Sequence, residues 1–347
     1  MSSDSTHSPA EPEHRKPTHP KPTPAPAPVP KPTPTPTPSP TPAPAPGAVT
    51  YTLLTEPDQG MQPIYNLLSS AAKSIDMTMY ELIDSEVTTI LTTAAGKGIA
   101  VRVILDQNEE KARNTATYNA LTAGKVQVHW ANPAYAVTHQ KTITIDQASS
   151  AIMTLNLTSE SYKTSRDFAV MTNDPADVAA IVATFNADFV NAAITPPTGD
   201  NLLWSPTNSR AALTALLNGA TQSLLISQEE FSDSEILATL LAALRRKVAI
   251  TLVQENQNNQ YSATLNELKA GGAQIATYSS STGYYIHAKT VVADFGTPQA
   301  KLFLGSENFS TYSLGKNREL GLIFSDPACI AGVHAAITAD YNNGTKF

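Results

Sequence analysis

The chain has 347 residues, and its 26 prolines are distributed unevenly, with 17 in residues 1–47 and nine in the 300 that follow. This distribution excludes one continuous globular fold. Beyond residue 47 there are 19 basic and 27 acidic residues, an acidic balance that excludes a broad electrostatic footprint for nucleic acid but leaves room for a local phosphate site. The single cysteine, Cys329, excludes an intramolecular disulfide.

Residues 1–47 are predicted to be a disordered, Pro-rich linker. Every second residue from Pro20 to Pro46 is proline, which fixes φ and removes amide donors, so neither a helix nor a sheet can form. Such a segment rises by about 3 Å per residue as an extended spacer. Thr/Ala/Pro spacers are typical of exported bacterial proteins. We therefore expect a secreted or cell-envelope protein whose signal sequence has been removed, since MSSDSTHSP lacks an apolar signal core.

The rest of the chain reads as a duplication. The segments that begin at Ser74 and Ser223 align without a gap at an offset of 149, and both contain Asp-Ser-Glu. Each predicts an apolar strand, an aspartate at a helix N-cap, an amphipathic helix and a second strand. The predicted strands are Ile75 to Tyr80 and Ile99 to Leu105 in the first copy, and Leu224 to Gln228 and Val248 to Val253 in the second.

This pattern predicts an α/β fold of two half-domains, 48–195 and 203–347, each a mixed sheet flanked by helices. The boundary is expected near residues 194–206, where Pro196-Pro197 and Gly199 interrupt the periodicity. Any two β-α-β units look broadly alike, which is the alternative explanation. The shared triplet and the register that continues at Gln127 and Gln274 favour duplication.

Two histidines occupy equivalent positions of the duplication, within THQKTITID and IHAKTVVAD. Residues two apart on a strand share one face, so the His and Lys of each copy are expected to point at the same phosphate. One H-x-K-x4-D match is a weak signal, but two at homologous positions are a strong one. The motif residues are His139, Lys141 and Asp146 in the first copy and His287, Lys289 and Asp294 in the second.

Further polar residues follow each motif at a common offset of 152. They are Thr154, Asn156 and Asp167 in the first copy, and Ser306, Asn308 and Glu319 in the second. Each half therefore offers a histidine, a lysine, a hydroxyl, an asparagine and a carboxylate in the same order. His129 and His334 have no equivalent in the other copy and are expected to be structural.

The paired H-x-K-x4-D motifs with a trailing G-S-x-N resemble the phospholipase D superfamily over about residues 50–345. The resemblance implies that the two halves pack about a pseudo-twofold axis and that His139 and His287 face one phosphate in a single cleft. The first copy departs from the family pattern, because Met153-Thr154 stands where the family has Gly-Ser.

Cleavage of a phosphodiester requires a nucleophile and an acid on opposite sides of phosphorus, and two histidines can supply both. By analogy with the family, His139 is expected to form a phosphohistidine and His287 to protonate the leaving alcohol. We expect no metal or other cofactor, because cationic side chains neutralise the phosphate. The remaining expected roles are phosphate binding for Lys141, Lys289, Asn156, Asn308, Thr154 and Ser306, histidine orientation for Asp167 and Glu319, and strand-turn structure for Asp146 and Asp294.

The leading functional hypothesis is a phospholipase D that hydrolyses glycerophospholipids to phosphatidic acid, or transfers the phosphatidyl group to another alcohol. Its partners would be the phospholipid and a membrane surface to which it binds peripherally, without an obligate protein partner. Trp130, Tyr284 and Tyr285 are candidates for an amphiphilic entrance, although core packing explains them equally well.

Three alternatives remain open from the sequence. A secreted, metal-independent endonuclease of the same superfamily would use a basic groove, and the only tight basic run beyond the tail is Arg245-Arg246-Lys247. Its place at the end of a predicted helix is explained more simply by the helix dipole. A non-enzymatic envelope-binding protein would use the tail, but the complete His/Lys pairs argue against it. A cardiolipin or phosphatidylserine synthase is the third alternative.

Overall fold

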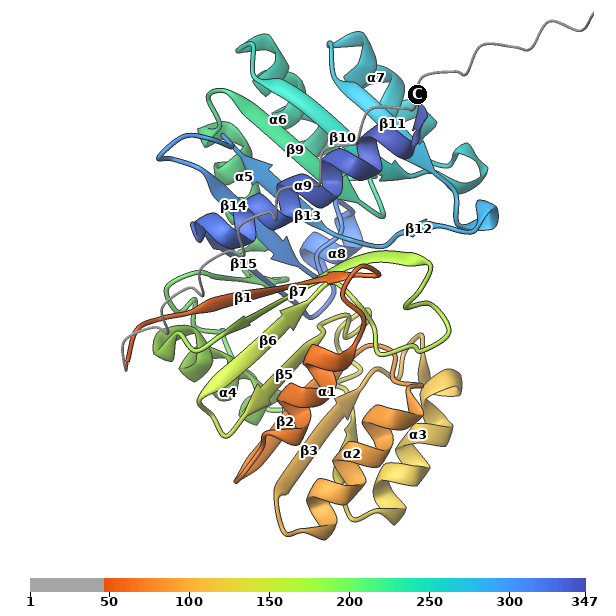
Figure 1. The fold of residues 1–347 in the computed structure, drawn as a ribbon, viewed down its shortest axis with the longest axis vertical. Helices are drawn as coiled ribbons and strands as arrows, with labels where there is room; N and C mark the ends of the chain where they lie inside the picture. Colours follow the sequence, from red (N-terminus) through yellow and green to blue (C-terminus); the bar gives the residue numbers. More distant parts are fainter. Residues whose placement is uncertain (1–46) are drawn as a thin grey trace, which may run out of the picture. The chain divides into compact units, whose positions relative to one another are not determined.

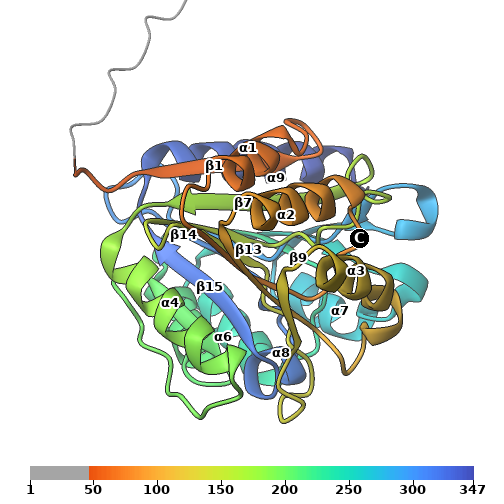
Figure 2. The same cartoon turned by 90° about the horizontal axis from the view of Figure 1, so that it is seen from below.

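The computed structural model describes residues 47–347, so the predicted Pro-rich linker lies outside the described residues apart from Gly47. Two mixed sheets of eight strands, each flanked by helices, form the described part of the chain (Figure 1). Figure 2 gives the perpendicular view. The predicted α/β class with two similar halves is confirmed.

The first half supplies one sheet with the strand order β1-β7-β6-β5-β2-β3-β4. Strands β2, β3 and β4 run parallel, and the others pair antiparallel. The elements are β1 (Tyr51–Glu56), α1 (Gln62–Ser69), β2 (Ser74–Met79), α2 (Ser85–Gly96), β3 (Ala100–Leu105), α3 (Lys111–Ala123), β4 (Gln127–Trp130), β5 (Thr142–Ile145), β6 (Ser149–Met153), β7 (Ser165–Thr172) and α4 (Pro175–Phe189).

The second half repeats this order as β8-β15-β14-β13-β9-β10-β11 and adds β16 at the edge. Its elements are β8 (Leu202–Ser205), α5 (Ser209–Gly219), β9 (Ser223–Gln228), α6 (Ser234–Arg245), β10 (Ala249–Glu255), α7 (Ser262–Ala270), β11 (Gln274–Tyr278), β12 (Tyr285–Ile286), β13 (Thr290–Ala293), β14 (Lys301–Gly305), α8 (Thr311–Gly315), β15 (Glu319–Phe324), α9 (Pro327–Asn343) and β16 (Thr345–Lys346), with short 3-10 turns at Gln257–Asn259 and Ser280–Thr282.

The repeated aspartates begin equivalent helices, as the sequence predicts. Asp84 accepts hydrogen bonds from the backbone N–H groups of Glu86 and Val87 at the start of α2. Asp233 does the same for α6. These caps satisfy amides that have no partner within the helix. Within residues 47–347, no helix combines the length and the apolar character needed to cross a bilayer.

The two halves are joined by pairing and by a shared core. Strand β12 of the second half pairs in parallel with β7 of the first. One buried cluster contains residues of both sheets, including Ile152 and Phe168 from the first and Leu304 and Leu320 from the second. Side chains that directly precede β5 and β13 can therefore meet between the halves.

Candidate active site

Both H-x-K motifs lie just before a central strand, not within it. His139 and Lys141 precede β5, and His287 and Lys289 lie between β12 and β13. The prediction that each pair lies on a strand was therefore wrong. Each lysine instead folds back to its own motif, since Nζ of Lys141 donates to the His139 carbonyl at 2.6 Å and Lys289 makes the equivalent bond to His287. All four side chains are buried.

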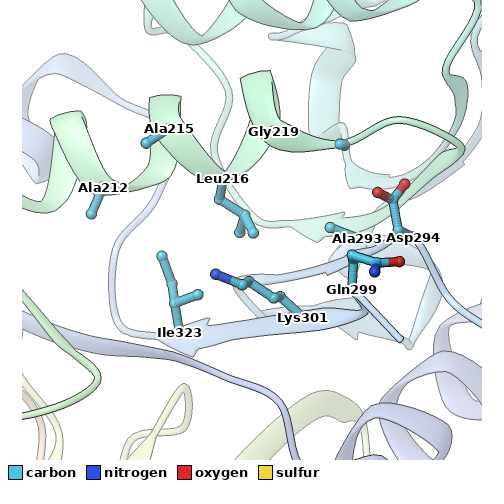
Figure 3. Close-up of a pocket in the computed structure, with 10 residues that line it drawn as sticks. Ala212, Ala215, Leu216, Gly219, Ala293, Asp294, Gln299, Lys301 and Ile323 are labelled. Carbon is cyan, nitrogen blue, oxygen red and sulfur yellow. The ribbon is translucent and has the colours of Figure 1, made fainter. Parts of the chain in front are cut away.

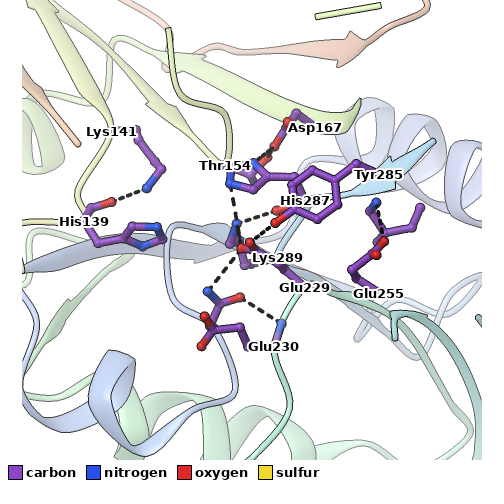
Figure 4. A network of polar contacts seen from close by, with 12 residues as sticks. His139, Lys141, Thr154, Asp167, Glu229, Glu230, Glu255, Tyr285, His287 and Lys289 are labelled. Atoms are coloured by element: carbon purple, nitrogen blue, oxygen red, sulfur yellow. Dashed lines mark hydrogen bonds and ion pairs between the residues drawn. The ribbon is translucent and has the colours of Figure 1, made fainter. Parts of the chain in front are cut away.

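Each histidine is held by a carboxylate of the opposite half. Nδ1 of His139 lies 2.9 Å from Oε2 of Glu319, and Nδ1 of His287 lies 2.8 Å from Oδ1 of Asp167 (Figure 4 labels the second pair). An ionised carboxylate can only accept a hydrogen bond, so Nδ1 carries the proton in each pair. This arrangement leaves Nε2 as the reactive atom of each ring, which can attack when it is unprotonated and act as an acid when it is protonated.

The residue before each carboxylate binds the backbone of the same histidine whose ring that carboxylate holds. The backbone N–H of His139 donates to the Arg318 carbonyl at 2.9 Å, and that of His287 donates to the Arg166 carbonyl at 3.2 Å. Two successive residues at the start of β7 or β15 thus hold both the backbone and the ring of one histidine. Because the contacts are reciprocal, they fit the pseudo-twofold relation between the halves.

Two buried ion pairs, which the sequence reasoning missed, support these segments. The Arg166 guanidinium binds Asp340 of α9 through Nε and Nη2, at 2.7 and 3.0 Å. The Arg318 guanidinium binds Asp188 of α4 at 2.9 Å. Each pair again joins one half to the other. Their signal was present in the sequence, because both the arginines and the aspartates are separated by the same 152 residues as the predicted carboxylates.

The two lysines have different neighbours. The Tyr80 ring, whose centroid is 4.8 Å from Lys141 Nζ, also meets His139 edge-on at 4.7 Å. Lys289 Nζ instead lies 2.5 Å from Oε2 of Glu229. Tyr80 and Glu229 are equivalent positions of the duplication, at the offset of 149. The surroundings of the two motifs are therefore chemically unequal.

Burial shifts the ionisation of the groups around His139. It lowers the pKa of His139, and the nearby Lys141 ammonium adds to the effect. Burial, reinforced by Lys289, lowers the pKa of Lys141 to about 7. For Glu319, burial favours the neutral acid, but the contacts with His139, Lys141 and Ser313 outweigh it and lower the pKa. A neutral imidazole facing an ionised carboxylate is the state expected at neutral pH.

Of the predicted hydroxyls, that of Thr154 bonds a carboxylate and that of Ser306 bonds the backbone of the residue after one. Thr154 Oγ1 donates to Asp167 Oδ1 at 2.6 Å, and the backbone N–H of Leu320 donates to Ser306 Oγ at 3.2 Å. Both residues are fully buried, and their predicted phosphate binding stays a prediction. The asparagines lie nearer the open space, since Asn156 and Asn308 line the cavities described below.

Asp146 and Asp294 lie in the turns that follow β5 and β13. The Asp146 carboxylate accepts from the backbone N–H groups of residues 72–74, and Asp294 accepts from those of residues 221–223. Burial favours the neutral acids, but these donors outweigh it and lower the pKa of both carboxyls. The geometry is that of a structural tie between neighbouring strands.

The second copy contains a buried carboxyl that sequence reasoning also missed. Glu307 is fully buried, and neither carboxyl oxygen has a hydrogen-bond partner among residues 47–347. Burial and the charge of Glu319 raise its pKa well above the usual range. Its carboxyl fills the space that side chains at Gly305 and Gly321 would occupy. The motif glycine of the second copy thus makes room for Glu307, and the first copy has Met153 and Leu155 instead.

Two small cavities open on the motif histidines. One of about 200 Å³ is lined by His139, Tyr80, Glu230 and Asn308. Another of about 150 Å³ is lined by His287, Asp167, Asn156 and Tyr285. A separate cavity of about 290 Å³ lies beside α5 (Figure 3) and contains neither histidine. Asp294 lines that cavity, but its carboxylate is already bound to backbone amides.

Of the other aromatic and basic candidates, one lines a cavity beside a motif histidine, and the rest pack against the core or bond the backbone. Tyr285 lines the His287 cavity, whereas Trp130 stacks on Tyr118 at 4.3 Å and packs against the first core. Tyr284 packs against the core that the halves share. In the basic run, Arg246 donates to backbone carbonyls of residues 217–220, which is a structural role.

The two histidines outside the motifs also contact the scaffold. His129 stacks on Phe189, with Nδ1 2.8 Å from that residue's carbonyl oxygen, and His334 stacks on Phe295. Among residues 47–347, no group of three or more His, Cys, Asp or Glu side chains is arranged to hold a metal ion.

A family model described as "Cardiolipin synthase, PLD-like domain" matches residues 64–189 and 213–341. The chain belongs to this family of phospholipase D-like proteins. Its two matches correspond to the two halves, and the predicted superfamily is confirmed. The members of this superfamily are phosphodiesterase or transferase enzymes, so the phospholipase D-like chain has a phosphodiesterase-type function. A comparison with curated protein sequences found no match.

Solved structures support the same fold. A phosphatidylserine synthase from Haemophilus influenzae Rd KW20 matches with a TM-score of 0.66 at 12% identity, over 86% of this chain and 87% of that one. A polyphosphate kinase from Porphyromonas gingivalis matches with a TM-score of 0.68 at 16% identity, over 85% of this chain. The match spans 48% of the kinase, about half of its length. At these identities the likeness concerns the fold alone.

Proposed function

We propose that this phospholipase D-like protein hydrolyses glycerophospholipids, releasing the head-group alcohol and leaving phosphatidic acid. The observation that carries the proposal is the pair of buried histidines, each oriented through Nδ1 by a carboxylate of the other half. Two Nε2 atoms contributed by opposite halves, one unprotonated as the nucleophile and one protonated as the acid, suit an in-line displacement at phosphorus.

In this mechanism His139 is the nucleophile. Its neutral state at neutral pH leaves a lone pair on Nε2, which attacks phosphorus as the bond to the head-group oxygen breaks. His287 starts as the imidazolium, with protons on both ring nitrogens; it gives its Nε2 proton to that oxygen, and the alcohol leaves. His287 then takes a proton from water, whose oxygen attacks phosphorus and breaks the P–N bond. The products are phosphatidic acid and a regenerated His139.

The neighbouring lysines, asparagines and carboxylates stabilise the charges that form during these steps. Lys141, Lys289, Asn156 and Asn308 offer donors to the non-bridging phosphate oxygens, where negative charge builds up in the transition state. Glu319 stabilises the positive charge that His139 acquires as it forms the P–N bond. An alcohol in place of water would yield a transferred phosphatidyl group, which relates hydrolysis to synthase chemistry.

The proposal extends to the setting of the enzyme. We place it in the cell envelope or outside the cell, bound peripherally to a membrane surface, with the Pro-rich segment as a spacer. Support comes from the composition of residues 1–47 and from the excess of acidic residues elsewhere, which suits a lipid phosphate better than a long polyanion.

A panel of phosphodiesters tests the proposed function. The wild-type protein is incubated with phosphatidylcholine vesicles and ethanol, and free choline and phosphatidylethanol are measured. We expect both products, and neither from His139→Ala. Plasmid DNA in EDTA forms a parallel arm. Plasmid cleavage that His287→Ala abolishes, without lipid turnover by the wild type, would overturn the lipid assignment in favour of a nuclease.

A further inference from the structure

Glu229 lies among the groups that are proposed to bind phosphate in the second half. Its Oε2 is 2.5 Å from Lys289 Nζ and accepts a hydrogen bond of 3.2 Å from Asn308 Nδ2. The same oxygen is 3.7 Å from His287 Nε2. The Tyr285 hydroxyl donates to the other carboxylate oxygen. Figure 4 shows Glu229 beside Lys289 and the Tyr285 ring, with dashed lines marking these contacts.

A phosphate oxygen would seek the same partners. An ammonium, an amide N–H and an imidazole N–H together form a typical oxyanion-binding set, and a carboxylate satisfies that set as an oxygen anion of similar charge. Glu229 is also held by the phenol of Tyr285, so its position is built by two elements, the end of β9 and β12. The second-half subsite is therefore already filled by an anion of the protein itself.

The first half provides an internal comparison. Tyr80 stands at the position equivalent to Glu229, and Lys141 meets its ring in place of a carboxylate. Lys141 donates one hydrogen bond to the His139 carbonyl, and its other N–H groups are left for an incoming anion. Among residues 47–347, a carboxylate thus contacts the motif lysine of the second half but not that of the first.

We propose that the Glu229 carboxylate is an internal competitor for the second-half phosphate subsite, which a substrate phosphate must displace to contact Lys289 and Asn308. The inference rests on the proposed function in assigning those two groups to the phosphate. Glu229 is then a specificity-determining residue, because its charge repels a phosphomonoester dianion about twice as strongly as a phosphodiester monoanion. It favours entry of the diester substrate and exit of the monoester product.

Protonation does not free the subsite from Glu229 near neutral pH. Burial favours the protonated acid, but Lys289 and His287 outweigh it and hold the pKa of Glu229 well below its usual value. The carboxylate is therefore ionised in the neutral range. Its displacement depends on a competing anion.

The test measures anion binding and does not require turnover. Isothermal titration calorimetry at pH 8 compares inorganic phosphate, mainly a dianion, with diethyl phosphate, a monoanion. For Glu229→Gln we expect phosphate to bind at least about tenfold more tightly than to the wild type, since a charge-assisted contact is freed. The gain for diethyl phosphate is expected to be smaller. Glu267→Gln, on the exposed face of α7, makes the same charge change and is expected to match the wild type.

A second variant keeps the proposal falsifiable if Glu229→Gln does not fold. Tyr285→Phe removes the phenol that holds Glu229 and leaves all charges in place, so phosphate is expected to bind about two- to fivefold more tightly. Unchanged or weaker phosphate binding in the folded variants would overturn the proposal. Tighter binding in Glu229→Gln together with no lipid turnover by the wild type would overturn the proposed function and leave the competitor role standing.

Discussion

Beyond the end of β2 the side chain that meets His139 is Tyr80, whereas the equivalent side chain beyond β9, next to His287, is Glu229. A second difference follows along the chain, where Leu155 of the first copy is aligned with Glu307 of the second. The backbone order of the two halves is nearly the same. Duplication thus preserved the frame that holds two imidazoles, while the side chains around them diverged, which gives the two histidines distinct chemical surroundings.

The largest expected effect is the loss of kcat when either motif histidine is replaced, and the choice of leaving group distinguishes the roles of the two. We expect His139→Ala and His287→Ala each to lower kcat on phosphatidylcholine by at least about 10³-fold. A phosphodiester with a p-nitrophenol leaving group needs little protonation, so the first step, seen as a burst of p-nitrophenol, is expected to recover most of its rate in His287→Ala and none in His139→Ala. Pre-steady-state kinetics with this substrate measures the burst. Equal recovery in both variants would contradict the assigned roles.

Breaking one crossed ion pair tests the reciprocal contacts between the halves. Arg166→Met leaves the buried Asp340 without its partner, and we expect the free energy of unfolding to fall by about 3–5 kcal/mol. Arg318→Met is expected to cost less, because Asp188 is more exposed than Asp340 and Arg166 also binds Asp58. Urea denaturation measures both. A loss below about 1 kcal/mol for Arg166→Met would show that the pair does not fasten the halves together.

A double-mutant cycle tests which carboxylate serves which histidine. Glu319→Gln and Asp167→Asn are each expected to lower kcat/KM by about 10²-fold, since each disturbs the tautomer of one imidazole. In a His139→Ala background, Glu319→Gln is expected to have almost no further effect, whereas Asp167→Asn still lowers the residual rate. The reverse pattern would show that the pairs are not crossed.

The smallest expected effect concerns Glu307. Its pKa is raised in the folded state, so above about pH 4.5 the unfolded chain ionises Glu307 while the folded protein keeps it protonated, and stability is lost as the pH rises. Glu307→Met is therefore expected to stabilise the fold by about 1–3 kcal/mol at pH 8 and by less at pH 4.5. Thermal unfolding at both values checks this. An equal change at the two values would contradict a protonated Glu307.

The sequence sufficed for the duplication, the helix caps at Asp84 and Asp233 and the positions of the motif residues, because these depend on local pattern and on repeat spacing. It did not show that each histidine is held by the other half, since that depends on how two sheets pack. The strand prediction for the motifs failed because each lysine turns back to bond the carbonyl of its own histidine.

In the sequence, Glu229 is an acidic residue aligned with a tyrosine of the other copy. A surface position that differs between the copies would look the same, so the alignment did not indicate a role. Arg166 and Arg318 carried a clearer signal in their common offset, but an arginine beside a carboxylate does not reveal a partner on a distant helix. Tertiary packing decided each of these roles.

Trapping the covalent intermediate tests the central claim most directly. His287→Ala is incubated with a short-chain p-nitrophenyl phosphodiester, quenched in alkali to preserve a phosphoramidate, digested and examined by mass spectrometry. The predicted result is a phosphoryl adduct on the peptide that contains His139, absent from the His139→Ala protein. An adduct on His287 in the wild type, or rapid turnover without an adduct on either histidine, would contradict the account.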